Sequence, residues 1–149
     1  MRGDSNDKIS GDCESYDVKT DSWTAIARLN TARYSSAAAT VSESVYVFGG
    51  FDSEGKTLDG GEQYNMAENK WTVVEARMNH ARGKLAAAVM DGSVYLIGGK
   101  KSDGFPDDYD NTVERFEAST KQFFDVAPLP RPVCYLAATT LLSLYAASF

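Results

Sequence analysis

The sequence contains one short segment twice, 49 residues apart: Val-Tyr-Val-Phe-Gly-Gly at 45–50 and Val-Tyr-Leu-Ile-Gly-Gly at 94–99. Each copy has four apolar or aromatic residues, too few for a helix, followed by two glycines that end a strand and turn the chain. A spacing of this size is typical of propellers and solenoids. The sequence therefore predicts a repeat protein built from short strands and turns.

The residues around these segments also recur. An apolar residue precedes an arginine by four positions twice, at Leu29 and Met78. A tyrosine precedes a tryptophan by seven positions, at Tyr16 and Tyr64, and phenylalanine fills both places in a third copy. No Trp-Asp pair, the mark of the competing WD propeller, is present. From about Cys13 to Leu144 the chain resembles the kelch repeat, and in particular the kelch-like (BTB-BACK-kelch) family.

This resemblance implies an all-β fold, a kelch-type β-propeller segment of about three four-stranded antiparallel blades. Residues 1–12 are expected to be a loop, and residues 13–32 to hold strands c and d of a first partial blade. Complete blades are expected at 33–81 and 82–127. Strands a and b of a last, degenerate blade fall in 128–149, where serine and phenylalanine replace the two glycines and put the pairing of the last strand in doubt. The alanine runs at 37–39 and 86–88 read as innermost strands, because small residues fit the narrow centre of a propeller.

Composition limits the kinds of partner. The 149 residues carry a net charge of −6, which disfavours a nucleic acid or an anionic membrane as the main partner. Two cysteines allow at most one disulfide, and we expect both to be reduced. The first residues lack the apolar core of a signal peptide, and the apolar stretch 136–149 is shorter than the roughly 20 residues of a membrane span. A cytoplasmic protein is predicted.

The repeated aromatic residues are expected to pack between sheets, with Trp23 and Trp71 as the largest. The glycine pairs are expected to provide backbone freedom rather than a phosphate cradle, since neither a helix nor a lysine of the nucleotide-binding type follows them. The structural repeat positions are Tyr16, Trp23, Tyr46, Gly49, Gly50, Tyr64, Trp71, Tyr95, Gly98, Gly99, Phe116, Phe123 and Tyr145.

In the kelch-like proteins, residues at and after the repeated arginine, and residues after the glycine pair, contact the bound peptide. The resemblance thus implies partner-binding roles for Arg33, Tyr34, Phe51, Arg82, Lys100 and Arg131. An arginine-bearing rim would favour an acidic peptide. The alternative is that the arginines are structural and hydrogen-bond loop carbonyls. Phe51 is expected to lie in an exposed loop.

Catalysis has little support in the sequence. His80 is the only histidine, so neither a catalytic triad nor a copper site of the kelch-fold oxidases can be assembled. Asp107, Asp108 and Asp110 do not have EF-hand spacing. No enzyme activity, cofactor or metal is expected.

The sequence favours a module that binds a protein or peptide. By resemblance, it would recognise substrates for a cullin-based ubiquitin ligase, with the ligase contacted through domains absent here. An actin- or cytoskeleton-binding kelch protein is the alternative, and a truncated, non-functional fragment is a minor one. The half-blades expected at both ends would expose strand edges, so a head-to-tail homodimer of six blades is a further possibility, with aggregation of a truncated product as its rival.

Overall fold

The computed structural model describes residues 9–140 and 144–148, and the regular elements in these residues are all strands. No helix in this part of the chain is long and apolar enough to cross a membrane. The strands are β1 (Cys13–Asp17), β2 (Ser22–Ile26), β3 (Ala37–Val41), β4 (Ser44–Phe48), β5 (Gly61–Asn65), β6 (Lys70–Val74), β7 (Ala86–Met90), β8 (Ser93–Ile97), β9 (Val113–Glu117), β10 (Gln122–Val126), β11 (Leu136–Thr140) and β12 (Leu144–Ser148).

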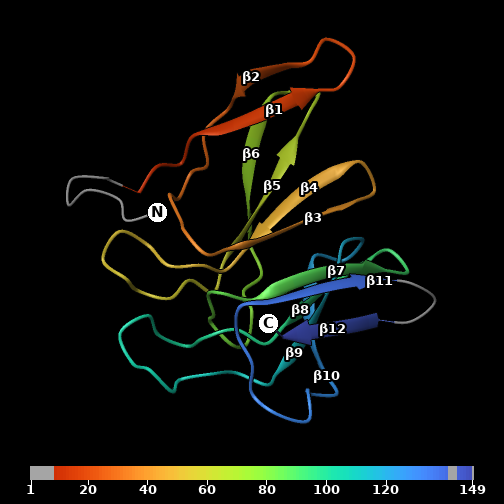
Figure 1. Ribbon diagram of the computed structural model, residues 1–149. Coiled ribbons are helices and arrows are strands. Elements are labelled where there is room, and N and C mark those ends of the chain that lie inside the picture. Colours follow the sequence, from red (N-terminus) through yellow and green to blue (C-terminus); the bar gives the residue numbers. More distant parts are fainter. Residues whose placement is uncertain (1–8, 141–143, 149) are drawn as a thin grey trace.

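These strands form four antiparallel sheets that follow one another along the chain (Figure 1). Strands β3 to β6 and β7 to β10 make two complete four-stranded sheets, whereas β1–β2 and β11–β12 are two-stranded. The first strands of successive sheets lie together, because β7 contacts both β3 and β11. The sheets thus radiate from a shared inner edge, as the propeller expectation requires.

The alanine runs are strands rather than helices. Ala37 pairs with Phe48, and Ala86 pairs with Ile97, each across a tight hairpin. In the first hairpin both turn residues, Ser42 and Glu43, have positive φ, as a two-residue turn that matches the twist of its strands requires. The turn and the partner strand therefore override the helical preference of alanine.

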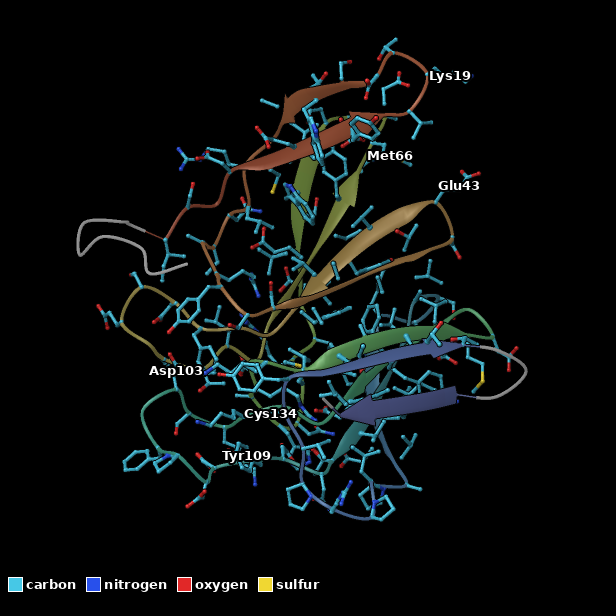
Figure 2. All side chains as sticks on the ribbon, in the orientation of Figure 1. Lys19, Glu43, Met66, Asp103, Tyr109 and Cys134 are labelled. Atoms are coloured by element: carbon cyan, nitrogen blue, oxygen red, sulfur yellow. The ribbon has the colours of Figure 1, made fainter. Side chains whose placement is uncertain are left out.

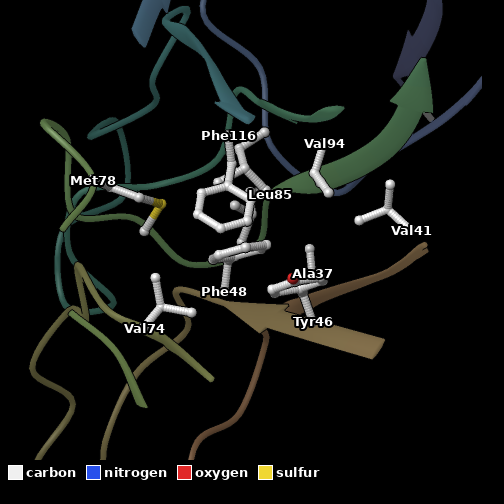
Figure 3. Close-up of a cluster of buried hydrophobic side chains, with 10 residues drawn as sticks. Ala37, Val41, Tyr46, Phe48, Val74, Met78, Leu85, Val94 and Phe116 are labelled. Atoms are coloured by element: carbon white, nitrogen blue, oxygen red, sulfur yellow. The ribbon is translucent and has the colours of Figure 1, made fainter. Parts of the chain in front are cut away.

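The main core lies between the two complete sheets (Figure 3). Side chains alternate along a strand, so Tyr46 and Phe48 of β4 face the second complete sheet, while Val47 faces β1–β2. The ring of Phe116 fills the gap, with its centroid 4.9 Å from that of Phe48. Both faces of a complete sheet are apolar, so each sheet needs a neighbour on both sides.

A second core joins β1–β2 to the first complete sheet. Tyr64 and Trp71 lie opposite each other on β5 and β6, with ring centroids 5.0 Å apart, and both are buried. The indole Nε1 of Trp71 donates a hydrogen bond of 2.9 Å to the carbonyl of Ala27, just after β2. This aromatic pair therefore packs the first complete sheet against β1–β2.

Two burial expectations are wrong. Trp23 was expected between sheets, but it is 67% exposed, because it lies on the face of β1–β2 that points away from the first complete sheet. Phe51 was expected in an exposed loop, but it is fully buried. Its ring covers the backbone of Gly83, where an added Cβ would come within 2.1 Å of the ring. Glycine in the next repeat thus creates the site that buries Phe51.

The pairing of the last strand, which the sequence left in doubt, is present in the backbone. Leu136 pairs with Ser148 across β11 and β12. Phe149 lies outside the described residues, as does the side chain of Tyr145.

The repeated glycines allow neighbouring sheets to approach. Gly49 has φ +64°, and a Cβ there would lie 2.3 Å from the carbonyl oxygen of Arg82 in the next repeat. That carbonyl accepts a hydrogen bond of 2.9 Å from the amide of Gly50. Gly98 repeats the arrangement against the carbonyl of Val133. Glycine is required here for both backbone torsion and space.

We predict that Phe51→Ala and Trp71→Ala will each lower the free energy of unfolding by about 3–5 kcal/mol, because both truncations leave cavities in a packed interface. Phe105→Ala is the matched control, since Phe105 follows the other glycine pair but is 70% exposed. Its effect should stay within about 0.5 kcal/mol. Urea denaturation provides the measurement, and equal effects of Phe51→Ala and Phe105→Ala would contradict the burial of Phe51.

Candidate partner-binding face

Loops from several sheets meet at one end of the structure. The segment that enters each inner strand pairs with the loop after the glycine pair, through bridges between Tyr34 and Phe51 and between Gly83 and Lys100. We call residues 34–36, 51–59, 83–85, 100–111 and 133–135 the loop face. Figure 2 shows Asp103, Tyr109 and Cys134 on this side, and Lys19, Glu43 and Met66 at hairpin turns on the other.

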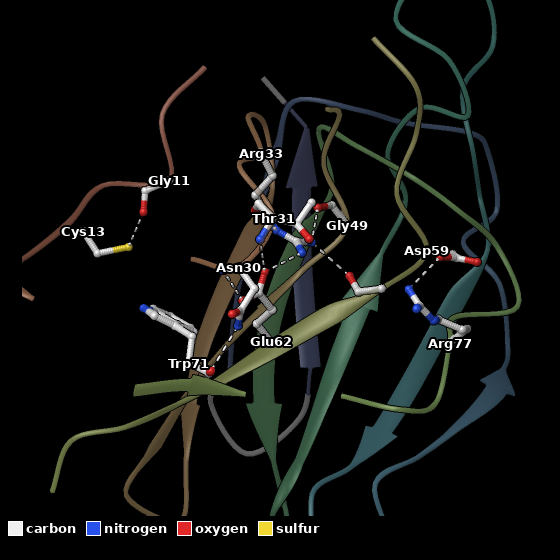
Figure 4. A network of polar contacts seen from close by, with 11 residues as sticks. Gly11, Cys13, Asn30, Thr31, Arg33, Gly49, Asp59, Glu62, Trp71 and Arg77 are labelled. Atoms are coloured by element: carbon white, nitrogen blue, oxygen red, sulfur yellow. Dashed lines mark hydrogen bonds and ion pairs between the residues drawn. The ribbon is translucent and has the colours of Figure 1, made fainter. Parts of the chain in front are cut away.

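The first two repeated arginines do not lie on the surface of this face. Arg33 is buried, and its Nη1 donates to the carbonyls of Gly49 and Gly60 at 3.0 and 3.1 Å (Figure 4). Its Nη2 lies 3.1 Å from Oε1 of Glu62. The guanidinium thus ties the end of β4 to the start of β5.

Arg82 repeats this arrangement one sheet later and is fully buried. Its Nη1 donates to the carbonyls of Gly98 and Thr112 at 3.2 and 2.9 Å, and its Nη2 lies 2.6 Å from Oε2 of Glu114. Asp110 is also buried, with Oδ2 3.9 Å from Nη1 of Arg82. Arg33 and Arg82 are therefore structural residues that hydrogen-bond loop carbonyls, which was the alternative to a partner-binding role.

The glutamates that pair with the arginines were missed as functional positions. Glu62 also accepts hydrogen bonds from the backbone amides of Asn30 and Thr31 at 2.8 and 3.0 Å. Glu114 likewise accepts from the amides of Asn79 and His80. Each glutamate stands two residues before the repeated aromatic residue, and this spacing is the sequence signal that could have revealed them.

The remaining nominated residues are divided between interior and surface. Lys100 is buried, and its Nζ donates to the carbonyl of Phe105 at 2.6 Å, which fixes the loop 100–111. Arg33, Phe51 and Arg82 are buried as well. All four side chains are too enclosed to contact a partner, so their predicted partner-binding roles are wrong. Tyr34 is half-buried and Arg131 is exposed. Both remain candidates.

A row of backbone contacts, which the sequence did not predict, crosses the loop face. Ser35, Lys84 and Tyr135 enter successive inner strands with φ of 54°, 54° and 52°. The amide of Lys84 donates to the carbonyl of Ser35 at 2.8 Å, and the amide of Tyr135 donates to the carbonyl of Lys84 at 3.2 Å. Left-handed torsions are uncommon in residues other than glycine, and where they persist they often mark functional positions.

Lys84 is the centre of a polar cluster in this row. Its Nζ lies 2.5 Å from Oδ1 of Asp103, whose other carboxylate oxygen accepts a hydrogen bond of 2.8 Å from the hydroxyl of Tyr34. The same Nζ lies 5.0 Å from the ring centroid of Tyr135. Burial disfavours the charged form of Lys84, but Asp103 and Tyr135 outweigh this effect and raise its pKa. The hydrogen bonds from Lys84 and Tyr34 lower the pKa of Asp103.

Aromatic side chains project from the loop face around this cluster. Tyr135 is 62% exposed, and Phe105 and Tyr109 are also exposed. Asp107 points to solvent, whereas Asp110 is buried and accepts a hydrogen bond from the amide of Thr112. Within the described ranges, no group of three or more His, Cys, Asp or Glu residues is placed to hold a metal ion. The exposed aromatic side chains of this surface are available for apolar contact with a partner.

We predict that Glu114→Gln will lower the free energy of unfolding by about 3–5 kcal/mol, because it removes the nearer of the two carboxylates that face the buried charge of Arg82. Arg77→Gln is the control, since the Arg77–Asp59 ion pair has both side chains more than half exposed. It should change stability by at most about 1 kcal/mol. Urea denaturation at neutral pH compares them, and similar shifts would contradict a structural role for the buried pair.

The cluster around Lys84 should respond to acid. The depressed pKa of Asp103 means that its ion pair is intact above the ordinary aspartate range and is lost as pH falls through the lowered value. In an NMR titration of the side-chain carboxyl carbon, Lys84→Met should move the Asp103 midpoint upward. Lys56→Met, which removes an exposed lysine of the same face, should leave it in place. An unchanged midpoint in Lys84→Met would contradict the pairing.

Comparison with known proteins identifies the repeat. The family model described as the Kelch motif matches residues 32–76 and 81–130. An F-box/kelch-repeat protein of Arabidopsis thaliana is 39% identical over 67 residues, which cover 45% of this chain and 18% of the relative. A second protein of this type from the same plant is 32% identical over 65 residues, covering 44% and 19%.

Among solved structures, YjhT matches with a TM-score of 0.74 at 16% identity, over 91% of this chain and 55% of YjhT. This likeness shows the fold alone. The matched segment spans less than a fifth of either plant relative. The family match over both complete sheets, together with the glycine pairs and the buried arginines, shows that this chain belongs to the kelch-repeat family and that its sheets are blades of a kelch propeller.

Proposed function

We propose that the loop face binds a protein or peptide partner and that the chain acts as the substrate-recognition part of a ubiquitin ligase adaptor. The observation that carries the binding proposal is the group of exposed aromatic side chains on the loop face, led by Tyr135. Tyrosine and phenylalanine are enriched in the buried centres of protein interfaces, because they offer large contact areas at a low cost in conformational entropy.

The backbone beneath these side chains supports a binding role. Tyr135 holds a left-handed conformation that its side chain disfavours, and its amide is fixed by the carbonyl of Lys84. Lys84 is in turn held by Asp103 from a different loop. A rigid rim presents side chains in one arrangement and reduces the entropy lost when a partner binds.

The partner expected from this surface differs from the acidic peptide that an arginine rim would favour. Arg33 and Arg82 are neutralised inside the structure by Glu62 and Glu114. Lys84 is paired with Asp103. A segment with apolar or aromatic side chains therefore fits the face better than a run of carboxylates, and Arg131 is a further exposed cation of the chain.

The adaptor role rests on the relatives. Both plant proteins are named as F-box/kelch-repeat proteins, and kelch repeats generally bind protein partners. This supports a place beside a cullin-based ligase more closely through an F-box than through BTB and BACK domains. Kelch domains of this kind are generally non-enzymatic, so the chain would contribute recognition and not catalysis. Filament binding would use the same loops.

The experiment compares proteins captured by the tagged product of the whole gene in its own cells. We predict that the double variant Tyr135→Ser/Phe105→Ser will lose specific partners, while its melting temperature changes little because both side chains are exposed. Met66→Ser, on the opposite side of the structure, should retain them.

The outcomes separate the two parts of the proposal. Partners that are equally retained by the double variant would refute binding at the loop face. Failure to recover a cullin with either form would refute the ligase assignment and leave the binding role intact. Cosedimentation of the wild-type protein with actin filaments, lost in the double variant, would favour the cytoskeletal alternative.

A further inference from the structure

The outer face of the second complete sheet carries an apolar groove. Its volume is about 230 Å³, and it lies on the side of β7–β10 opposite the main core. The sheet β11–β12 contacts this sheet at β7, along the inner edge. The groove is lined by Met90, Tyr95, Ile97, Val113, Val126, Ala127 and Leu129.

The groove repeats a surface that is occupied elsewhere in the same chain. On the first sheet, the residues packed against the Tyr64–Trp71 pair include Cys13, Ile26, Ala27 and Leu29. The groove residues Val113, Val126, Ala127 and Leu129 stand 100 positions later, each in the same place of its repeat. The groove therefore matches the surface that receives the aromatic pair of β5 and β6. It is shaped to receive an equivalent pair from the third and fourth strands of another blade.

One such pair is exposed in this chain. Tyr16 and Trp23 lie opposite each other on β1 and β2, with ring centroids 5.1 Å apart and an interplanar angle of 43°. The seated pair, Tyr64 and Trp71, has nearly the same geometry, at 5.0 Å and 40°. Trp71 donates its indole N–H to the carbonyl of Ala27. The repeat equivalent of that acceptor is Ala127, which lines the groove.

The polar residues beside the aromatic pairs also match. Five residues after the first aromatic residue of each pair stands a polar residue with positive φ. These residues are Asp21, Asn69 and Lys121, with φ of 50°, 46° and 58°. In the two occupied interfaces this residue bonds to the preceding sheet, since Asn69 accepts from the amide of Ala27 and Lys121 donates to Gln63 at 2.8 Å.

At the groove, the position of Gln63 is taken by Arg115, which neighbours Tyr95 across β8 and β9. The Nε of Arg115 is buried, and among the residues that the structure describes it has no hydrogen-bond partner. The matching residue on the exposed hairpin is the carboxylate Asp21. Opposite charges therefore stand at the two positions that this contact would bring together.

The backbone permits the same contact. In both complete sheets the second strand pairs with the third, as β4 does with β5 and β8 with β9. In the described part of the chain, β12 pairs only with β11, and β1 only with β2. Unpaired strand edges are templates for association.

We propose that a second copy of this chain inserts its β1–β2 hairpin beside β12, placing Tyr16 and Trp23 in the groove and Asp21 against Arg115. The composite sheet then has the order β11–β12–β1–β2, with the last two strands from the partner copy. Each copy has two complete sheets and two half sheets. Reciprocal insertion thus gives four complete and two composite sheets about a two-fold axis, within the range of closed propellers.

Sedimentation velocity of the 149-residue chain over a concentration series tests this contact. We expect a compact dimer for the wild-type protein and a folded monomer for Trp23→Ala. Phe105→Ala, which removes an equally exposed aromatic residue of the loop face, should remain dimeric. A wild-type chain that stays a folded monomer, open-ended oligomers that grow with concentration, or a dimer that survives Trp23→Ala would overturn the proposal.

A charge exchange tests the contact without removing an aromatic ring. Asp21→Lys places like charges against Arg115, and Arg115→Asp does the same against Asp21, so each variant alone should lose the dimer. The chain itself tolerates lysine at this left-handed position, in Lys121. An equimolar mixture should restore the dimer, because the mixed pair has one native contact and one reversed contact. If the mixture remains monomeric while both variants are folded by circular dichroism, the proposed contact is wrong.

Discussion

The buried arginine–glutamate pair is the interaction on which each complete blade depends. Arg82 brings together the carbonyls of Gly98 and Thr112 and the carboxylate of Glu114, and Glu114 also binds two backbone amides from the preceding connection. A buried charge is tolerable only when its partners are complete. This network therefore sets the relative positions of the inner strand, the end of the second strand and the start of the third.

The network explains why the glycine pairs and the aromatic residues must recur with it. The carbonyl of Gly98 can reach Arg82 only where the chain turns sharply, with φ of +57° at that residue. The turn also leaves the space in which the carbonyl of Val133 approaches from the following repeat. Polar contacts at the loop end and aromatic packing along the sheets thus act together, and each repeat supplies part of its neighbour's interior.

The two kinds of surface left by this arrangement have different physical character. The loop face is mixed in charge, with Lys84 paired to Asp103, and it carries exposed aromatic side chains. The outer face of β1–β2 and the groove on the second complete sheet are continuations of the interior, where apolar side chains stand at the spacing of a blade interface. The proposed recognition of a partner and the proposed association between two copies would therefore use different surfaces.

The sequence by itself determined the strands and their order, because the turn residues and period-two alternation are local properties. The alanine run at 37–39 could be read as a strand for this reason, once its repeat had been aligned. The cluster around Lys84 had no such signal, since Tyr34 and Tyr135 contact Asp103 and Lys84 from the repeats before and after theirs.

Only the tertiary structure decided which of these residues face water. Trp23 and Trp71 occupy the same place in their repeats, yet one is exposed and the other buried, because a sheet lies against only one of them. Arg82 could equally have pointed to a partner until Glu114 and two carbonyls were shown to enclose it. Burial depends on neighbours distant in sequence, and residue type and spacing do not record which neighbours are present.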